Sequence, residues 1–176
     1  MTVTFPEGTK AQGNISVRVV QTIADPEAPK LATEINAATS VDVSCFLYGG
    51  GIGTSTQNKG EAPRRICATD TFQEFGNTTY EVSDLQYAYD PQQALSAAVN
   101  KARQILEPGT EVWLVVRLGL AANSEAWAEG QIVDLWHVRL GRQNKTTTGD
   151  AEFDQLSITQ GAIVLRAPVE DVALVA

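Results

Sequence analysis

The residue types that most often carry out covalent chemistry are scarce in this sequence. A nucleophilic triad places a base, usually histidine, beside its nucleophile. The only histidine is His137, which stands between Trp136 and Val138 in a predicted strand. This position favours a structural or interface role for His137. Cys45 and Cys67 are too few to form a zinc site with one histidine, and without a secretory signal we expect both thiols to be free.

Acidic side chains alternate toward the C-terminal end of the chain. Asp150, Glu152 and Asp154 would share one face if this stretch were a strand. Calcium loops with a recognisable pattern have a different spacing, so we expect a solvated face and no metal or other cofactor. A hydrolase with two carboxylates stays an alternative, because such acids can be distant in sequence, but no pattern points to one.

A glycine-rich stretch follows a predicted strand in the first half of the chain. It lacks the Gly-Lys-Ser/Thr ending of a phosphate-binding loop, and no predicted helix follows it. Its composition predicts a long, polar, flexible arm over Gly49–Arg65, and a compact domain keeps so long a connection only when it has a function. The residues that we expect to contact another subunit are Gly49, Gly50, Gly51, Ile52, Gly53, Lys59, Arg64 and Arg65.

The bulk properties narrow the class of protein. The chain has 176 residues, which predicts a single domain over residues 1–176 with the arm as an insertion. Its 21 acidic and 13 basic residues leave a net charge of −8, which argues against a protein that grips nucleic acid through phosphates. The N-terminus is not that of a signal peptide, and no apolar run is long enough to span a bilayer. We therefore expect no membrane partner.

The clearest strand is apolar on both faces. In Glu111–Leu120, one face carries Val112, Leu114 and Val116, and the other carries Trp113 and neighbouring apolar residues. A one-sided antiparallel sheet would alternate apolar with polar residues. Something must therefore cover both faces, either a second layer of the same domain or another subunit. The tryptophans are expected in the core or at an interface.

The remaining elements make the chain mainly β. One helix is predicted over Pro91–Leu106, with Asp90 as its N-cap and an apolar stripe through Leu95, Val99, Ala102 and Leu106. The other predicted strands are Ile15–Ile23, Val41–Leu47, Arg65–Phe75, Tyr80–Tyr89, Gln131–Leu140, Phe153–Ile158 and Ile163–Arg166, with a turn at Gly76 and Asn77.

Several of these features, in this order and over most of the chain, resemble the major tail tube protein of long-tailed bacteriophages, particularly of actinobacterial phages. The first is the segment Pro29–Leu47, with Glu34-Ile35-Asn36 before a strand. The polar arm follows, then the single helix and a β-rich second half. The chain ends with the segments Gly149–Arg166 and Val169–Ala176.

The resemblance implies a fold and a role. The fold would be a β-sandwich or rolled barrel with one flanking α-helix. Subunits would join as hexameric rings that stack into a tube, present in the virion and built in the host cytoplasm, with DNA only as transiting cargo. The other implied partners are the tape measure protein and the tail terminator and baseplate proteins. Acids would line the lumen, and the candidates are Asp134, Asp150, Glu152 and Asp154.

Two alternatives compete with this interpretation. The tube of the type VI secretion system has a related fold, so the resemblance does not fix the role uniquely. A cytosolic β-barrel that binds an apolar small molecule would also have strands that are apolar on both faces, because the inner face would line a cavity. The size of the protein in solution separates the barrel from a tube subunit, which should form rings or filaments.

Overall fold

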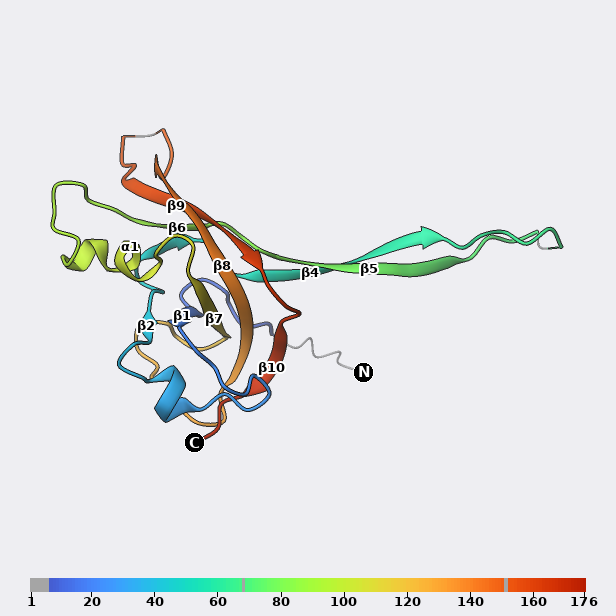
Figure 1. Ribbon diagram of the computed structural model, residues 1–176, viewed down its shortest axis with the longest axis horizontal. Helices are drawn as coiled ribbons and strands as arrows, with labels where there is room; N and C mark the ends of the chain where they lie inside the picture. The colour runs from blue at the N-terminus through green and yellow to red at the C-terminus, as the bar shows by residue number, and fades with distance from the viewer. Residues whose placement is uncertain (1–6, 68, 151) are drawn as a thin grey trace, which may run out of the picture.

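The computed structural model describes residues 7–67, 69–150 and 152–176. It consists of a rounded body of curled sheet from which one long β-hairpin projects (Figure 1). The strands are β1 (Ile15–Val20), β2 (Val41–Asp42), β3 (Leu47–Gly49), β4 (Gly53–Glu61), β5 (Gln73–Val82), β6 (Leu85–Ala88), β7 (Glu111–Leu118), β8 (Ile132–Thr147), β9 (Leu156–Val164) and β10 (Val169–Ala173). The helical elements are a π-helical turn η1 (Leu31–Ile35), a 3-10 turn η2 (Ala98–Asn100) and the helix α1 (Lys101–Ile105).

The body is an antiparallel sheet that curls back on itself. Its strand order is β2-β1-β7-β8-β9-β6-β3, and β10 pairs with β8 beside this path. The two outermost strands, β2 and β3, are consecutive in the chain. Between them, Val43 N–H donates to Val17 O on one side, and Ala88 N–H donates to Phe46 O on the other. One short segment thus covers both edges of the sheet, which confirms the predicted rolled, mainly β architecture and protects the edges from unwanted pairing.

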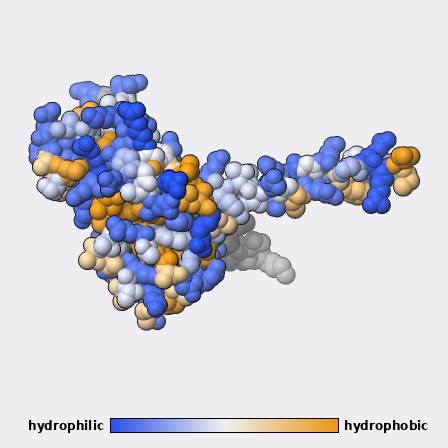
Figure 2. All heavy atoms as spheres, in the orientation of Figure 1, coloured by the Kyte–Doolittle hydropathy of each residue, from blue (hydrophilic) through white to orange (hydrophobic). Residues whose placement is uncertain are grey.

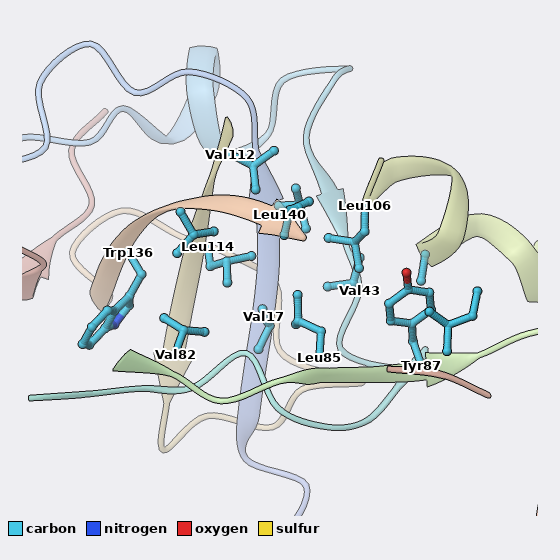
Figure 3. Packing of buried hydrophobic residues seen from close by; sticks show 14 of the residues in the cluster. Val17, Val43, Val82, Leu85, Tyr87, Leu106, Val112, Leu114, Trp136 and Leu140 are labelled. Atoms are coloured by element: carbon cyan, nitrogen blue, oxygen red, sulfur yellow. The ribbon is translucent and has the colours of Figure 1, made fainter. Parts of the chain in front are cut away.

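The inside of the curl is a close-packed apolar core. Trp136, Leu114 and Val82 lie together at one end of it, and Leu106 and Tyr87 lie toward the other (Figure 3). These side chains are 7% exposed or less. The core therefore binds strands from both halves of the chain into one unit.

A second apolar cluster lies on the opposite face of the same strands. It combines Trp113 and Val115 of β7 with Leu135 of β8, and it is covered by Ile35 of η1 and by Leu174. The expectation that β7 is covered on both faces is confirmed, and both covers come from the same subunit. The strand is apolar on both faces because it is the middle layer of the body.

Arg117 is the buried polar residue of β7, and its side chain binds the loop over residues 119–131. Its guanidinium is fully buried and donates to the carbonyl oxygens of Ala121, Glu125 and Ala126 at 3.0–3.3 Å. It also stacks at 4.6 Å on the ring of Trp127. Burial lowers the pKa of Arg117. The buried cation of Arg117 thus ties the loop to β7, beside backbone bonds such as Ala122 N–H to Gly13 O and Gly130 N–H to Leu174 O.

The predicted helix over Pro91–Leu106 is wrong in its first half. Helical structure begins only at Ala98, and Leu95, which the apolar stripe predicted to be buried, is 49% exposed. The cause is Asn100, whose fully buried amide donates to the carbonyl oxygens of Asp90, Gln93 and Ala94. Carbonyl groups that bond to an asparagine side chain are diverted from the helical ladder, so the segment folds as a loop around Asn100.

Several predicted strand boundaries also differ from the structure. Val41–Leu47 is interrupted by a turn, and Cys45 in it is exposed. The strand expected at Arg65 begins at Gln73, because a turn comes first, and β5 then passes straight through the predicted turn at Gly76. The two strands expected after residue 153 are one strand, β9. In each case pairing across the sheet decided the boundary, and local composition did not.

Candidate assembly surface

The root of the projecting hairpin is built from glycines that lie against the body. Gly50 and Gly51 have positive φ angles of 90° and 74°, which glycine adopts without strain. At Gly53 an added β-carbon would lie 2.0–2.2 Å from ring atoms of Trp136. The glycines predicted to be a linker are therefore the tightest contact between hairpin and body. Backbone bonds from Gly51 N–H to Ser83 O and from Ser83 N–H to Ile52 O, both 3.1 Å, fix the direction of the hairpin.

The predicted flexible arm is one strand of a two-stranded antiparallel ribbon. β4 pairs with β5 from Gly53↔Val82 to Glu61↔Gln73, with one register shift between Gln57 and Lys59. Nine residues of β4 correspond to a shaft of about 30 Å. The prediction of a structureless loop is therefore wrong, and the reason is that the partner strand comes from residues 73–82. We call this ribbon with its tip, residues 53–82, the arm.

The shaft has almost no apolar support of its own. Every side chain from Thr54 to Glu61 and from Gln73 to Thr79 is exposed. Thr, Ser, Gln and Asn dominate, and Figure 2 shows a largely hydrophilic shaft with apolar atoms at its free end. An isolated two-stranded ribbon is marginally stable in water. The arm therefore has two unpaired edges and two polar faces that the body leaves open.

The tip of the arm carries the exposed apolar and basic side chains. The ladder extends to a bond from Ala62 N–H to Phe72 O at 2.8 Å. Ile66 is fully exposed, and Phe72 is 70% exposed. Arg64 and Arg65, which end the predicted arm Gly49–Arg65, follow β4 and so lie at the far end of the ribbon. Lys59 lies on the shaft with its ammonium 6.0 Å from the centre of the Phe75 ring.

The structure separates the acidic residues that the sequence grouped as lumen candidates. Asp134 lies on β8, where its carboxylate accepts a bond from Asp171 N–H at 2.9 Å and so holds β10. Asp150, Glu152 and Asp154 lie in the β8–β9 turn, so the premise that strand alternation puts them on one face is wrong. Asp154 accepts a bond from the Thr148 hydroxyl at 3.0 Å. That these acids line a lumen stays a prediction.

The residues that the sequence offered for covalent chemistry are His137, Cys45 and Cys67. His137 stacks on Trp113, with ring centres 4.6 Å apart, and Arg166 lies over the same indole. Burial lowers the pKa of His137, and Arg166 lowers it further, while Glu111 opposes the shift. Cys45 and Cys67 are free and exposed, as expected. Within residues 7–67, 69–150 and 152–176, no group of His, Cys, Asp and Glu is placed to hold a metal ion.

Sequence reasoning missed two features that the structure assembles. The first is Arg117, whose period-two position with Trp113 and Val115 puts it on a covered face. Gly141 and Gly161 lie side by side across β8 and β9, where a β-carbon on Gly141 would stand 2.9 Å from Gly161 O. The burial of Arg117 could have been predicted from the alternation of the strand. The approach of Gly141 to Gly161 could not, because it depends on the pairing of β8 with β9.

Taken together, a curled and internally packed β body with an uncovered arm defines a structural subunit. The profile of the family described as phage tail tube protein matches residues 2–176. The chain therefore belongs to the phage tail tube protein family. No curated protein matches the chain.

The family places the protein in the phage virion as a component of the tail tube. Tail tube proteins are structural, so the role of this chain is structural. None of the helices among the described residues is long and apolar enough to cross a membrane.

Proposed function

We propose that this protein assembles as hexameric rings that stack into the tail tube through which DNA is ejected. The observation that carries the proposal is the arm, which reaches about 30 Å beyond the body and ends in exposed Ile66 and Phe72. Large exposed apolar side chains at the end of a projecting element are typical of interaction sites. Because a tail tube is built from many copies of its subunit, we take a second copy of the chain as the partner of the arm tip.

The arm is proposed to be mobile in the free subunit and ordered by a neighbouring subunit or ring. Its side chains bury too little apolar area to hold it alone. Arg64 and Arg65 at the tip are proposed to pair with acids of that neighbour, since arginine forms bidentate bonds with carboxylates. The net charge of −8 supports a conduit that DNA slides through without binding.

The remaining parts of the proposal follow from the tube. The subunit performs no catalysis, and assembly takes place in the host cytoplasm with the tape measure, tail terminator and baseplate proteins as further partners. Within the tail tube family, we propose a long-tailed actinobacterial phage as the source of the tube. The tube of a type VI secretion system is the alternative role for the same fold. The competing small-molecule barrel needs an inner cavity, whereas the inside of this curl is filled by side chains such as Trp136 and Tyr87 (Figure 3).

Excision of the arm tests the proposal. Gly53 and Val82 face each other in register, so residues 54–81 can be replaced by Asn-Gly, which closes a two-residue hairpin. We expect a folded body with an unchanged melting temperature and no rings or tubes in negative-stain micrographs. The matched control replaces Thr56 and Thr79, a cross-strand pair on the shaft, with serine and should assemble normally. Normal tubes from the excised protein would refute the role given to the arm.

A further inference from the structure

A hollow on the sheet surface lies where β8 and β9 pair irregularly. The register shifts between Leu140 and Gln143, so Gly141 and Arg142 together oppose Gly161. Two neighbouring glycines leave backbone uncovered, and the hollow that results has a volume of about 480 Å³. Its lining includes Asp84, Arg139, Arg142, Asn144, Ala162 and Ile163. The surface offers a site with a backbone floor and charged walls.

The walls of this hollow are apolar and basic. Ile163 is 60% exposed, opposite Arg139 in the register. Arg139 is bonded to Glu111, whereas Arg142 is exposed and makes no ion pair with any described residue. Arg139 and Arg142 face Asp84 as the one acid of the lining, so Arg142 is the cation that the hollow leaves for a partner's carboxylate. Such a mixture suits an aromatic group that is flanked by carboxylates.

The β8–β9 turn at the end of the same ladder has this character. Phe153 in the turn is 88% exposed. Its neighbours Asp150 and Glu152 are exposed, and with Asp154 the stretch 148–155 has a charge of −3 and no basic residue. The turn is braced by a bond from Thr148 N–H to Gln155 O at 2.9 Å. Phe153 is thus presented on a closed turn.

The turn cannot fill the hollow of its own chain. Six residue steps along β8 lead from Gly141 to Thr147, where the turn begins, and they span about 20 Å. The ladder between them is hydrogen-bonded and cannot fold back. The arm tip over residues 64–74 also exposes an aromatic side chain, Phe72, but it has two basic and two acidic residues and therefore no net charge. Because the β8–β9 turn is acidic and the arm tip has no net charge, we take the turn of a second copy, and not the arm tip, as the occupant of the hollow.

We propose that Phe153 of one copy packs over Gly141 and Gly161 of the next copy, with Glu152 beside Arg142. An aromatic ring over a glycine covers backbone that glycine leaves bare. Turn and hollow are different surfaces, so the contact is head to tail and propagates into a ring or a filament. The inference rests on the proposed tube function and names a contact within it. It places Asp150 and Glu152 at a subunit interface, not in the lumen wall predicted from the sequence.

Mixing two half-defective subunits tests the contact. Phe153→Ser removes the aromatic side chain that packs into the hollow, which we call the knob. Gly161→Thr places a side chain in the hollow, and its β-carbon would stand 3.4 Å from an Asp84 carboxylate oxygen, an ordinary contact distance. Each variant alone should self-associate at least about tenfold more weakly than the wild type in sedimentation velocity, as expected for an interface anchor. An equimolar mixture should form a heterodimer and nothing larger, because only one knob and one hollow remain.

A charge exchange provides a second readout if the first variants fold poorly. Glu152→Arg and Arg142→Glu should each weaken association, and the double variant should recover to within about threefold of the wild type. The controls are Glu129→Arg and Lys10→Glu, which change the same charges at exposed positions outside the hollow and the turn. Single variants that associate like the wild type, or a double variant without recovery, would overturn the proposal.

A cross-link tests the pairing without requiring complete tubes. In a Cys45→Ser, Cys67→Ser background, Glu152→Cys and Arg142→Cys in one chain, which keep Phe153 and Gly161, should give a ladder of covalent oligomers on mild oxidation. Either cysteine alone should give at most a dimer. A chain with both cysteines that stays monomeric refutes the contact. Normal tubes from Phe153→Ser would refute it while the tube function stands, and a ladder from a protein without the arm would separate this contact from the arm.

Discussion

Replacing Gly53 by alanine should wedge the arm away from the body. The new β-carbon would stand 2.0–2.2 Å from Trp136 ring atoms, whereas ordinary contact begins at 3.4 Å. The β-carbon would therefore lie 1.2–1.4 Å closer to the ring than ordinary contact allows. Trp136 is 2% exposed in a close-packed core and has no space into which to retreat. The strand must therefore move.

The expected cost is that of overpacking, about 1–3 kcal/mol in the free energy of unfolding. For a chain of this size each kcal/mol corresponds to a fall of about 2–4 °C in melting temperature. Urea unfolding followed by tryptophan fluorescence measures the change, because Trp136 is itself the residue under strain. A shifted root would also misdirect the tip by several ångströms along a shaft of about 30 Å, so tube formation should fall as well.

Gly60 provides a matched control on the same strand. An added β-carbon there meets nothing within 4 Å. Gly60→Ala should therefore leave the free energy of unfolding unchanged or raise it by up to about 1 kcal/mol, because alanine restricts the unfolded chain. If Gly53→Ala and Gly60→Ala unfold at the same urea concentration, the close approach of Gly53 to Trp136 does not exist in solution, and the reasoning fails.

Two further predictions concern the body. Arg117→Met should lower the free energy of unfolding by about 1–3 kcal/mol, because carbonyl oxygens of residues 121, 125 and 126 lose their donor; equal urea midpoints for Arg117→Met and the wild type would contradict this. The lowered pKa of His137 means that the fold holds the neutral ring, so this contribution to stability is complete above the unfolded-state pKa near 6.5 and is lost as the pH falls through the lower folded-state value. His137→Phe keeps the stack on Trp113 without the proton, so its melting temperature should fall less than that of the wild type between pH 7 and 5.5, and parallel curves would rule out the linkage.

Strand composition and alternation were sufficient for the architecture. The two apolar faces of Glu111–Leu118 predict that both are covered, by the same domain or by another subunit, and the structure places Leu114 in one core of the same chain and Trp113 in the other. This works because alternation is a local property, which the pleat of a strand converts directly into two faces. The family resemblance rested on the order of such elements along the chain, and the family match over residues 2–176 confirms the tail tube family.

The sequence by itself thus determined a mainly β subunit with a long polar projection. Tertiary structure decided how that projection is built. Residues 53–61 are too polar to predict a strand, and they form one because residues 73–82 pair with them. The same pairing carries Arg64 and Arg65 to the tip. The side chain of Asn100 bonds to backbone carbonyl groups, so the first half of the predicted helix is a loop. The Gly141–Gly161 hollow exists because the register of β8 and β9 shifts there. Each of these depends on contacts between residues distant in sequence, which local propensity does not contain.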